Sequence, residues 1–274
     1  MKHTTELSGS LAGLDLGNPE VSNQSNVLDI EVPDQMNEVI STGMPHVDAL
    51  FAGDGMVPGT VTMFTGLPGT GKTTFAIQLA DSCTKEGHLA VYTGLEESLY
   101  QTRRTVSRLG CKHGFVPDYT ADVQTLLARV DSISALKENK GKKVVLVVDS
   151  LPCLTVKSGA STKRPRGRPL SGEKMVEEAL KHIVAWAKRT WSCVLVLNHT
   201  TKGGKFAGKN LLKHLVDAHL HASWDRNRKS DTHGERIMEM EKNRFGTAGL
   251  FYPFKLRANG LVFEGETGYD DTAV

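Results

Sequence analysis

One short glycine-rich segment constrains the fold of this 274-residue chain more than any other feature. Residues 66–73 read Gly-Leu-Pro-Gly-Thr-Gly-Lys-Thr, which matches the pattern G-x-x-x-x-G-K-[ST]. The segment follows the apolar run Val61–Thr65 and leads into Lys72–Lys85, where apolar residues recur at helical spacing. In such a strand–turn–helix, successive backbone N–H groups surround phosphate oxygens and the helix N-terminus adds partial positive charge. The sequence therefore predicts a nucleoside triphosphate site in a P-loop α/β fold.

The residues of this loop have distinct expected roles. Lys72 is expected to bridge the β- and γ-phosphates of ATP, and the Thr73 hydroxyl to ligate Mg²⁺. ATP and Mg²⁺ are therefore the expected cofactors. The predicted nucleotide-binding residues are Gly66, Pro68, Gly69, Thr70, Gly71, Lys72, Thr73 and Thr74.

Further strands and helices alternate along the chain. Leu89–Thr93, Val144–Val148 and Cys193–Leu197 are continuous apolar or β-branched runs, typical of parallel strands buried on both faces. Glu173–Thr190 has helical spacing, and Ser98–Leu109 is a polar, arginine-rich helix candidate. This alternation predicts a mainly parallel sheet flanked by helices, with ligand sites at the carboxyl ends of the strands. Two later strand patterns predict an antiparallel C-terminal extension of that sheet: Glu235–Lys242 and Leu250–Phe263.

Polar residues stand where three of these strands end. Asp149 ends the run that begins at Val144, which makes it the expected second Mg²⁺ ligand. Glu96 is the expected group that activates water, with Glu97 as its rival and a solvated acid at a helix start as the alternative. His199 follows the run Cys193–Leu197 and is expected to sense the γ-phosphate, although a lone histidine is more often structural.

The chain divides into three parts by composition. Residues 1–40 hold one lysine against seven acids, with no aromatic residue and no arginine, which predicts a mobile acidic tail. The alternative is a short strand near Val27–Val32 that docks on the core. Residues 41–264 form the predicted ATPase core, and 265–274 a flexible C-terminal tail.

Two segments concentrate positive charge, although the whole chain has a net charge of only +2. Residues 157–172 carry five bases and 202–213 carry four, without an acid. Both follow strand ends, and basic loops of this kind, rich in Gly and Lys, suit phosphate contacts with single-stranded DNA. Residues 163–169, Lys-Arg-Pro-Arg-Gly-Arg-Pro, also fit an AT-hook for duplex DNA or a solvated insertion. The predicted DNA-binding residues are Lys157, Lys163, Arg164, Arg166, Arg168, Lys202, Lys205 and Lys209.

Composition excludes several other classes of protein. The longest aliphatic runs are far too short to span a bilayer, and the first residues do not read as a signal segment. The four cysteines form no C-x-x-C pair, which argues against a zinc ribbon or a disulfide framework and favours a reducing, cytoplasmic setting.

Three motifs resemble the RadA/Sms group of RecA/KaiC-superfamily ATPases. Residues 41–59 resemble the lead-in to the P-loop of that superfamily, and 198–217 resemble a RadA/Sms stretch that begins Gly-His-Val-Thr-Lys-Glu-Gly. Residues 242–246, Lys-Asn-Arg-Phe-Gly, reproduce a RadA/Sms signature without change. The resemblance covers about residues 41–263. It implies a RecA-like fold and a DNA-dependent ATPase, with DNA helicase as a further activity, that acts as a hexameric ring in recombination, branch migration or repair.

The resemblance also assigns roles and marks departures. It implies that Lys242 and Arg244 reach the ATP of a neighbouring subunit, with a basic strand end that makes surface ion pairs as the alternative. A recombinase or replication protein is a further expected partner. The zinc motif and the Lon-like domain of the family are absent from this sequence, so the chain is expected to be a stripped core of the kind a phage or plasmid would carry. A family arginine is Thr105 here, with Arg104 as its substitute. Two other functions stay open: a KaiC-like regulatory ATPase that acts on protein partners, and a recombinase or mediator that uses ATP only to assemble.

Overall fold

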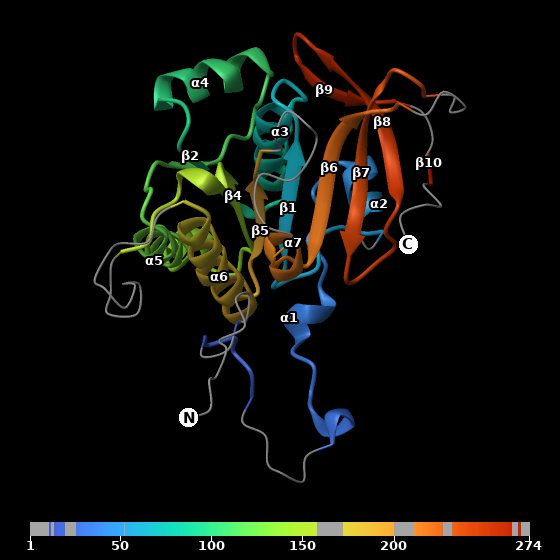
Figure 1. The fold of residues 1–274 in the computed structure, drawn as a ribbon. Helices are drawn as coiled ribbons and strands as arrows, with labels where there is room; N and C mark the ends of the chain where they lie inside the picture. The colour runs from blue at the N-terminus through green and yellow to red at the C-terminus, as the bar shows by residue number, and fades with distance from the viewer. Residues whose placement is uncertain are drawn as a thin grey trace.

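The computed structural model describes residues 11, 14–19, 26–51, 53–157, 172–199, 211–226, 232–264 and 268–269. One mixed sheet of ten strands crosses the described part of the chain (Figure 1). The strand order is β10-β8-β7-β6-β1-β5-β4-β2-β3, and β9 pairs with residues 254–257 of β8. The predicted α/β class, mainly parallel with an antiparallel C-terminal extension, is confirmed.

Six strands run parallel and form the half of the sheet that carries the P-loop. They are β1 (Val61–Gly66), β2 (Leu89–Gly94), β3 (Val116–Asp118), β4 (Val144–Asp149), β5 (Cys193–Leu197) and β6 (Ala218–Trp224). The registers pair Phe64 with Leu197 and Gly94 with Asp149, so the carboxyl ends of β1, β5, β4 and β2 share one edge. The strands β3 and β6 were not among the predicted elements.

Helices cover both faces of the sheet, as Figure 1 shows. On one face lie α2 (Pro45–Leu50) and α3 (Lys72–Lys85), and on the other α5 (Val123–Ser134), α6 (Glu173–Thr190) and α7 (Leu211–Leu215). The alternation of β4 explains this division, because Val145 and Val147 pack with the α3 side while Leu146 and Val148 pack with α5 and α6. Successive side chains of a strand point to opposite faces, so an all-apolar strand needs a cover on each side.

The antiparallel half extends the sheet beyond β6. It contains β7 (Arg236–Asn243), β8 (Leu250–Arg257), β9 (Gly260–Phe263) and β10 (Gly268–Tyr269). The run predicted over Leu250–Phe263 is therefore a hairpin of two strands. Within 265–274, where the sequence predicts a flexible tail, Gly268 and Tyr269 pair with the free edge of β8.

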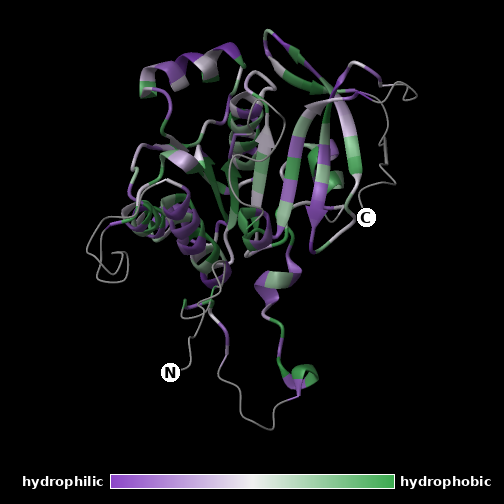
Figure 2. Cartoon of the chain, viewed as in Figure 1, coloured by the Kyte–Doolittle hydropathy of each residue, from purple (hydrophilic) through white to green (hydrophobic). Residues whose placement is uncertain are grey.

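Two polar segments stand apart from the core. The arginine-rich helix α4 (Leu99–Arg108) begins at a capping box of Ser98 and Gln101 and buries only Thr102, and it is mostly hydrophilic in Figure 2. Near the N-terminus, Val27–Asp29 forms a 3-10 helix, η1, and Asp34–Asn37 a single helical turn, α1. Because Leu28 is 87% exposed and no pairing is present at Val27–Val32, the docked-strand alternative is wrong there.

The remaining short elements are η2 (Lys137–Asn139) and η3 (Leu151–Cys153). Across the described ranges, no helix combines the length and the apolar character that a membrane span requires.

Candidate functional site

The P-loop joins the end of β1 to the start of α3. Gly71 precedes the helix with φ +100°, a left-handed conformation that favours glycine, and a Cβ there would lie 2.6 Å from Leu256 Cδ2 of β8. Gly71 also provides no side-chain cap, so no side chain accepts from the first N–H groups of α3. These groups and the helix dipole together make the turn suitable for an anion.

The other predicted phosphate-loop residues surround this turn. Pro68 and Gly69 are exposed, Thr74 is half-buried in the first turn of α3, and Gly66 is buried at the end of β1. Thr70 is buried and its hydroxyl donates to the Leu67 carbonyl at 2.8 Å, which closes the loop on itself.

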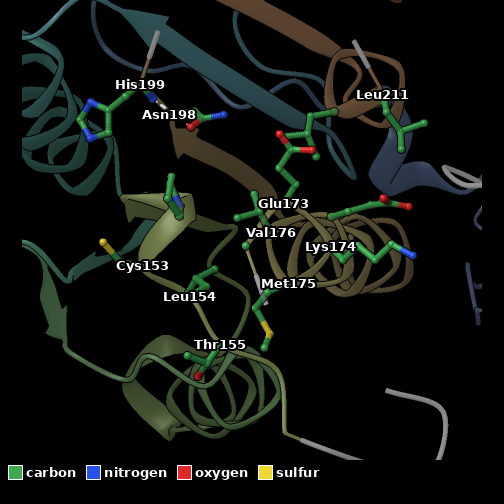
Figure 3. A pocket seen from close by; sticks show the side chains of 14 residues that line it. Cys153, Leu154, Thr155, Glu173, Lys174, Met175, Val176, Asn198, His199 and Leu211 are labelled. Carbon is green, nitrogen blue, oxygen red and sulfur yellow. Dashed lines mark hydrogen bonds between the residues drawn. The ribbon is translucent and has the colours of Figure 1, made fainter. Parts of the chain in front are cut away.

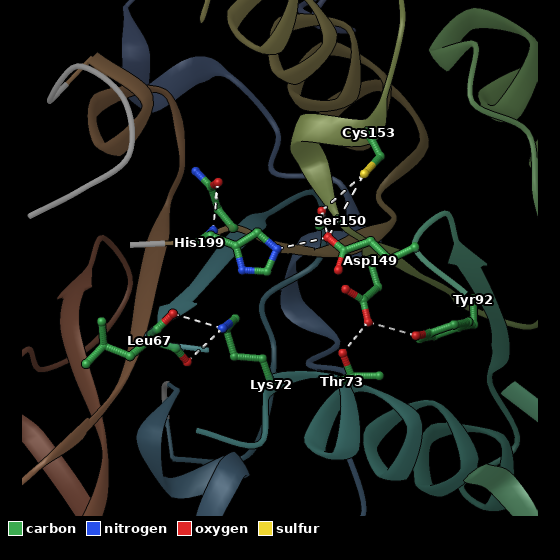
Figure 4. Close-up of polar contacts among 11 residues, drawn as sticks. Leu67, Lys72, Thr73, Tyr92, Asp149, Ser150, Cys153 and His199 are labelled. Atoms are coloured by element: carbon green, nitrogen blue, oxygen red, sulfur yellow. Dashed lines mark hydrogen bonds and ion pairs between the residues drawn. The ribbon is translucent and has the colours of Figure 1, made fainter. Parts of the chain in front are cut away.

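The Lys72 ammonium is buried beneath the loop. Its Nζ donates to the carbonyl oxygens of Gly66 at 2.8 Å and Leu67 at 3.1 Å (Figure 4). Burial lowers the pKa of Lys72, and the negative charges of Asp149 and Glu96 oppose that shift. A phosphate beside Nζ would therefore replace carbonyl partners with charged ones, which an ammonium prefers.

Asp149, at the end of β4, lies against the first turn of α3. Its Oδ2 accepts from Thr73 Oγ1 at 2.7 Å and from the Tyr92 hydroxyl at 2.9 Å (Figure 4). The residue is 5% exposed, and burial raises the pKa of its carboxyl group although both hydrogen bonds oppose the rise. A carboxylate and a hydroxyl, both oxygen donors at the phosphate loop, form the donor set that suits Mg²⁺. The two predicted metal ligands, Thr73 and Asp149, are thus brought together.

Glu96 joins two strand ends that are far apart in the sequence. Its Oε1 lies 2.9 Å from His199 Nε2 and accepts a hydrogen bond from the Ser150 hydroxyl. Burial acts to raise the pKa of Glu96, but the bonds from His199 and Ser150 outweigh it and hold the pKa below its usual value. The rival Glu97 is exposed and has no part in this cluster. The geometry therefore places Glu96 with the predicted sensor His199 and with the side of the sheet that carries Lys72.

Sequence reasoning did not identify Tyr92, Ser150 or Cys153 as members of the site. Tyr92 is the one aromatic in an otherwise aliphatic buried strand, and a buried phenol needs a hydrogen-bond partner, which was an available signal. Ser150 directly follows Asp149. The Cys153 thiol lies 3.6 Å from Ser150 Oγ and 4.0 Å from Glu96 Oε1, a contact with no sequence signal.

Lys242 and Arg244 lie at the opposite end of the sheet from the P-loop of the same chain. Lys242 of β7 pairs with His219 near the start of β6, whereas Gly66 pairs with Ala222 near the end of β6. Lys242 Nζ donates to the carbonyl oxygens at 213 and 216, at 2.8 and 2.7 Å. Arg244 donates to Asp217 Oδ1 at 3.0 Å. Neither cation reaches the nucleotide site of its own chain.

A cavity of about 610 Å³ adjoins the Glu96–His199 pair (Figure 3). It lies between η3, the start of α6, the end of β5 and the start of α7. Gly172, His199 and Leu211 line it, and these residues flank 158–171 and 200–210, which hold most of the two basic segments. The attachment points of both basic segments therefore converge beside the catalytic candidates.

Most predicted DNA-binding residues lie outside the described residues. These are Lys163, Arg164, Arg166, Arg168, Lys202, Lys205 and Lys209. Lys157 is described: its Nζ donates to Thr125 Oγ1 at 2.6 Å and lies 3.4 Å from Asp122 Oδ1, at the start of α5.

Comparisons with known proteins agree with this architecture. A model of the family "ATPase: KaiC" matches residues 40–116. A KaiC-like protein from Pyrococcus horikoshii OT3 has the same fold, with a TM-score of 0.61 and 22% identity over 83% of this chain and 99% of that one.

Curated relatives carry the name DNA repair protein RadA. The protein from Mycobacterium tuberculosis H37Rv is 32% identical over 223 residues, which is 80% of this chain and 42% of the relative. Those from Mycolicibacterium smegmatis and Rickettsia bellii are 33% and 31% identical, over 80% and 86% of this chain. The chain spans less than half the length of these relatives. With the P-loop, Asp149 and the sheet order in place, the chain is a RadA-like ATPase core of the RecA/KaiC superfamily.

Proposed function

We propose that this core is the motor of a DNA-dependent ATPase of RadA type, which assembles as a ring and moves along single-stranded DNA in the bacterial cytoplasm. The observation that carries the proposal is the 2.9 Å contact between Glu96 and His199. His199 lies three residues before Lys202, where the basic segment 202–213 begins, so a residue that contacts the water-activating candidate is close in sequence to a DNA-binding candidate. The relatives' name, DNA repair protein RadA, supports the same process.

Glu96 acts as the group that orients and deprotonates the attacking water. Its lowered pKa keeps it a carboxylate at neutral pH, as a general base requires. His199, Ser150 and Cys153 all contact Oε1, so Oε2 is the oxygen that approaches water. When His199 turns towards a γ-phosphate it releases Glu96, which links the presence of triphosphate to the state of the base.

Lys72 and the P-loop hold the transferred phosphoryl group. Mg²⁺, held by Thr73 and Asp149, neutralises charge on the phosphates when it is bound. Lys72 exchanges its bonds to the loop carbonyls for phosphate oxygens, and the N-terminus of α3 offsets the remaining negative charge.

Lys242 and Arg244 complete the ATP site of a neighbouring subunit. Their distance from the P-loop of the same chain is consistent with that role, because β7 runs antiparallel to β6 and ends away from the nucleotide site. A cation delivered by a neighbour stabilises charge on the γ-phosphoryl group and makes hydrolysis depend on assembly. The Arg244–Asp217 and Lys242–carbonyl bonds fix these side chains until a neighbour is present.

The two basic segments bind the DNA backbone. Their attachment points meet at the cavity beside His199, so strain in either segment is transmitted to Glu96 over a short path. Phosphate contacts of this kind give weak sequence preference and strong salt dependence. If 163–169 acts as an AT-hook, an AT-rich duplex competes better than a GC-rich one.

The test is ATP turnover with and without single-stranded DNA, for the wild type and for His199→Gln. We expect DNA to stimulate the wild type, and His199→Gln to retain basal nucleotide binding but lose the stimulation. Electron microscopy with a non-hydrolysable ATP analogue should show rings threaded by DNA. Turnover at background level in the presence of DNA, or a particle that stays monomeric, would refute the motor.

The match of the KaiC family model to residues 40–116 favours one alternative, a regulatory ATPase that acts on protein partners. Turnover that is robust without DNA and indifferent to its addition would favour that alternative.

A further inference from the structure

A cluster of polar side chains lies on the α7 face of the sheet, directly behind the P-loop. It consists of Thr65, His219, His221, Glu241 and Lys213. Thr65 is the last residue before Gly66, whose carbonyl oxygen accepts from Lys72. The neighbouring β1 residues on that face, Val61 and Met63, are apolar and fully buried. A charged cluster in such surroundings requires complete hydrogen bonding to be stable.

The cluster forms a continuous series of close polar contacts. Lys213 Nζ and His219 Nδ1 each lie 2.8 Å from Glu241 Oε2. His219 Nε2 lies 2.7 Å from Thr65 Oγ1, and the same hydroxyl lies 2.7 Å from His221 Nδ1. The chain therefore runs from α7 through β7, β6 and β1 to the base of the P-loop.

Glu241 carries the negative charge of the cluster. Contacts with His219 and Lys213 outweigh burial and bring the pKa of Glu241 to about 2, so it is a carboxylate at pH 7. The Thr65 hydroxyl has one proton and two lone pairs, so it can bond both histidine rings at once, and these contacts fix where the His221 ring lies.

His221 is positioned to respond to charge at the nucleotide site. Its side chain is 19% exposed, which lets solvent deliver a proton. Burial lowers its pKa, Glu241 opposes this, and His219, Lys213 and Lys72 add to the lowering. It is therefore neutral at pH 7 while Lys72 has no phosphate partner. A bound phosphate cancels the positive charge of Lys72 and favours the imidazolium.

We propose that His221 takes up one proton from solvent when nucleotide phosphate binds beside Lys72, with Thr65, His219 and Glu241 holding its ring in place. The proposal rests on nucleotide binding at the P-loop and is independent of DNA. By linkage, protonation of His221 tightens nucleotide binding by the same factor by which the nucleotide favours protonation. MgADP therefore binds more tightly at pH 6 than at pH 8.

The test is calorimetric titration of MgADP at pH 7 in buffers of different ionisation enthalpy, which measures the protons taken up on binding. The variants are His221→Asn, whose amide can still donate to Thr65, and the control His214→Asn, an exposed histidine of α7. We expect the wild type and His214→Asn to take up a substantial fraction of a proton more than His221→Asn. MgADP affinity of the wild type should rise from pH 8 to pH 6 more than that of His221→Asn does. The excess should reach up to about tenfold for each unit by which MgADP raises the pKa of His221. Because the nucleotide and the buffer titrate in the same way with each protein, subtracting the proton uptake of His221→Asn from that of the wild type removes their contribution.

A second measurement needs no variant. In ¹⁵N spectra of the wild type, one histidine ring should change from the neutral form to the cation on addition of MgADP. Equal proton uptake by wild type and His221→Asn, or spectra in which no histidine becomes protonated, would overturn the proposal and leave the P-loop assignment intact. Failure of the wild type to bind MgADP would overturn both.

Discussion

The replacement Glu96→Gln separates catalysis from folding more sharply than any other change in this site. Both Glu96 and His199 side chains are 40% exposed, so their pair is worth only about 0.2–1 kcal/mol to the fold. For a domain of this size, 1 kcal/mol shifts the melting temperature by roughly 2–4 °C. The introduced glutamine amide keeps an oxygen that accepts from Ser150 and His199, which reduces the cost further. We therefore expect almost unchanged stability.

The expected effect of this replacement on turnover is far larger. A positioned general base contributes about 10²–10⁴-fold to a rate, and an amide cannot take the proton of water. ATP turnover should fall by at least about 100-fold, while binding of a fluorescent ATP analogue stays within about threefold of wild type. Glu97→Gln is the matched control, because Glu97 is adjacent and exposed but outside the cluster. It should retain wild-type turnover.

The refuting results are specific. If Glu96→Gln is folded and still turns over ATP within about threefold of wild type, Glu96 is not the base. If Glu97→Gln shows the large loss instead, the rival carboxylate performs the chemistry, and the contact between Glu96 and His199 has only a structural role.

Three further perturbations test the surrounding structure. Because the pKa of Glu241 is about 2 in the fold and 4.5 when unfolded, its ionised carboxylate adds about 3 kcal/mol to the free energy of unfolding, fully present above pH 4.5 and lost as the pH falls through about 2. In urea unfolding, the free energy of unfolding should therefore fall more between pH 7 and pH 3 for the wild type than for Glu241→Gln. Gly71→Ala should weaken MgADP binding and cost about 1–3 kcal/mol in thermal unfolding, because Leu256 can move but the positive φ cannot relax; unchanged binding would contradict this. Lys72→Ala and Arg244→Ala should each abolish turnover, but if Arg244 acts on a neighbour, about a quarter of the interfaces in a mixture of the two variants should regain activity, because they pair an intact Lys72 with an intact Arg244. A mixture that assembles as rings but shows no turnover argues against that role.

The apolar strands and the long helices could be predicted because local pattern determines them. Continuous apolar or β-branched runs of five residues identified β1, β2, β4 and β5. The pattern failed at β6, where His219 and His221 face the same side of the sheet as buried apolar residues elsewhere. Histidines on a buried face remove the period-two signal, and only partners distant in sequence stabilise them there. β3 is three residues long with a central proline, which suits an edge strand but gives too little pattern to recognise.

The candidate site could also be predicted from the sequence only in part. Sheet topology places strand ends together, so the positions of Lys72, Asp149 and Glu96 could be anticipated from the sequence. The hydrogen bond between His199 and Glu96 joins residues 103 positions apart, and that between Tyr92 and Asp149 joins residues 57 apart. Such contacts depend on side-chain direction at two separate strand ends, which no local pattern encodes.

The placement of Lys242 and Arg244 has a consequence for how a core of this kind is controlled. The phosphate loop, the predicted metal ligands and the water-activating candidate lie at the carboxyl ends of the parallel strands. Lys242 and Arg244 lie at the opposite ends of the strands, bonded to α7 and the segment between α7 and β6. A single chain thus brings together the predicted phosphate-binding, metal-binding and water-activating residues but not these two cations. Because α7 also carries Lys213 of the Glu241 cluster, the segment that holds the cations is connected through polar contacts of Glu241, His219 and Thr65 to the base of its own P-loop. If the chain assembles as proposed and Lys242 and Arg244 turn towards a neighbour, we expect the change to reach the chain's own nucleotide site and so to couple successive sites around the ring.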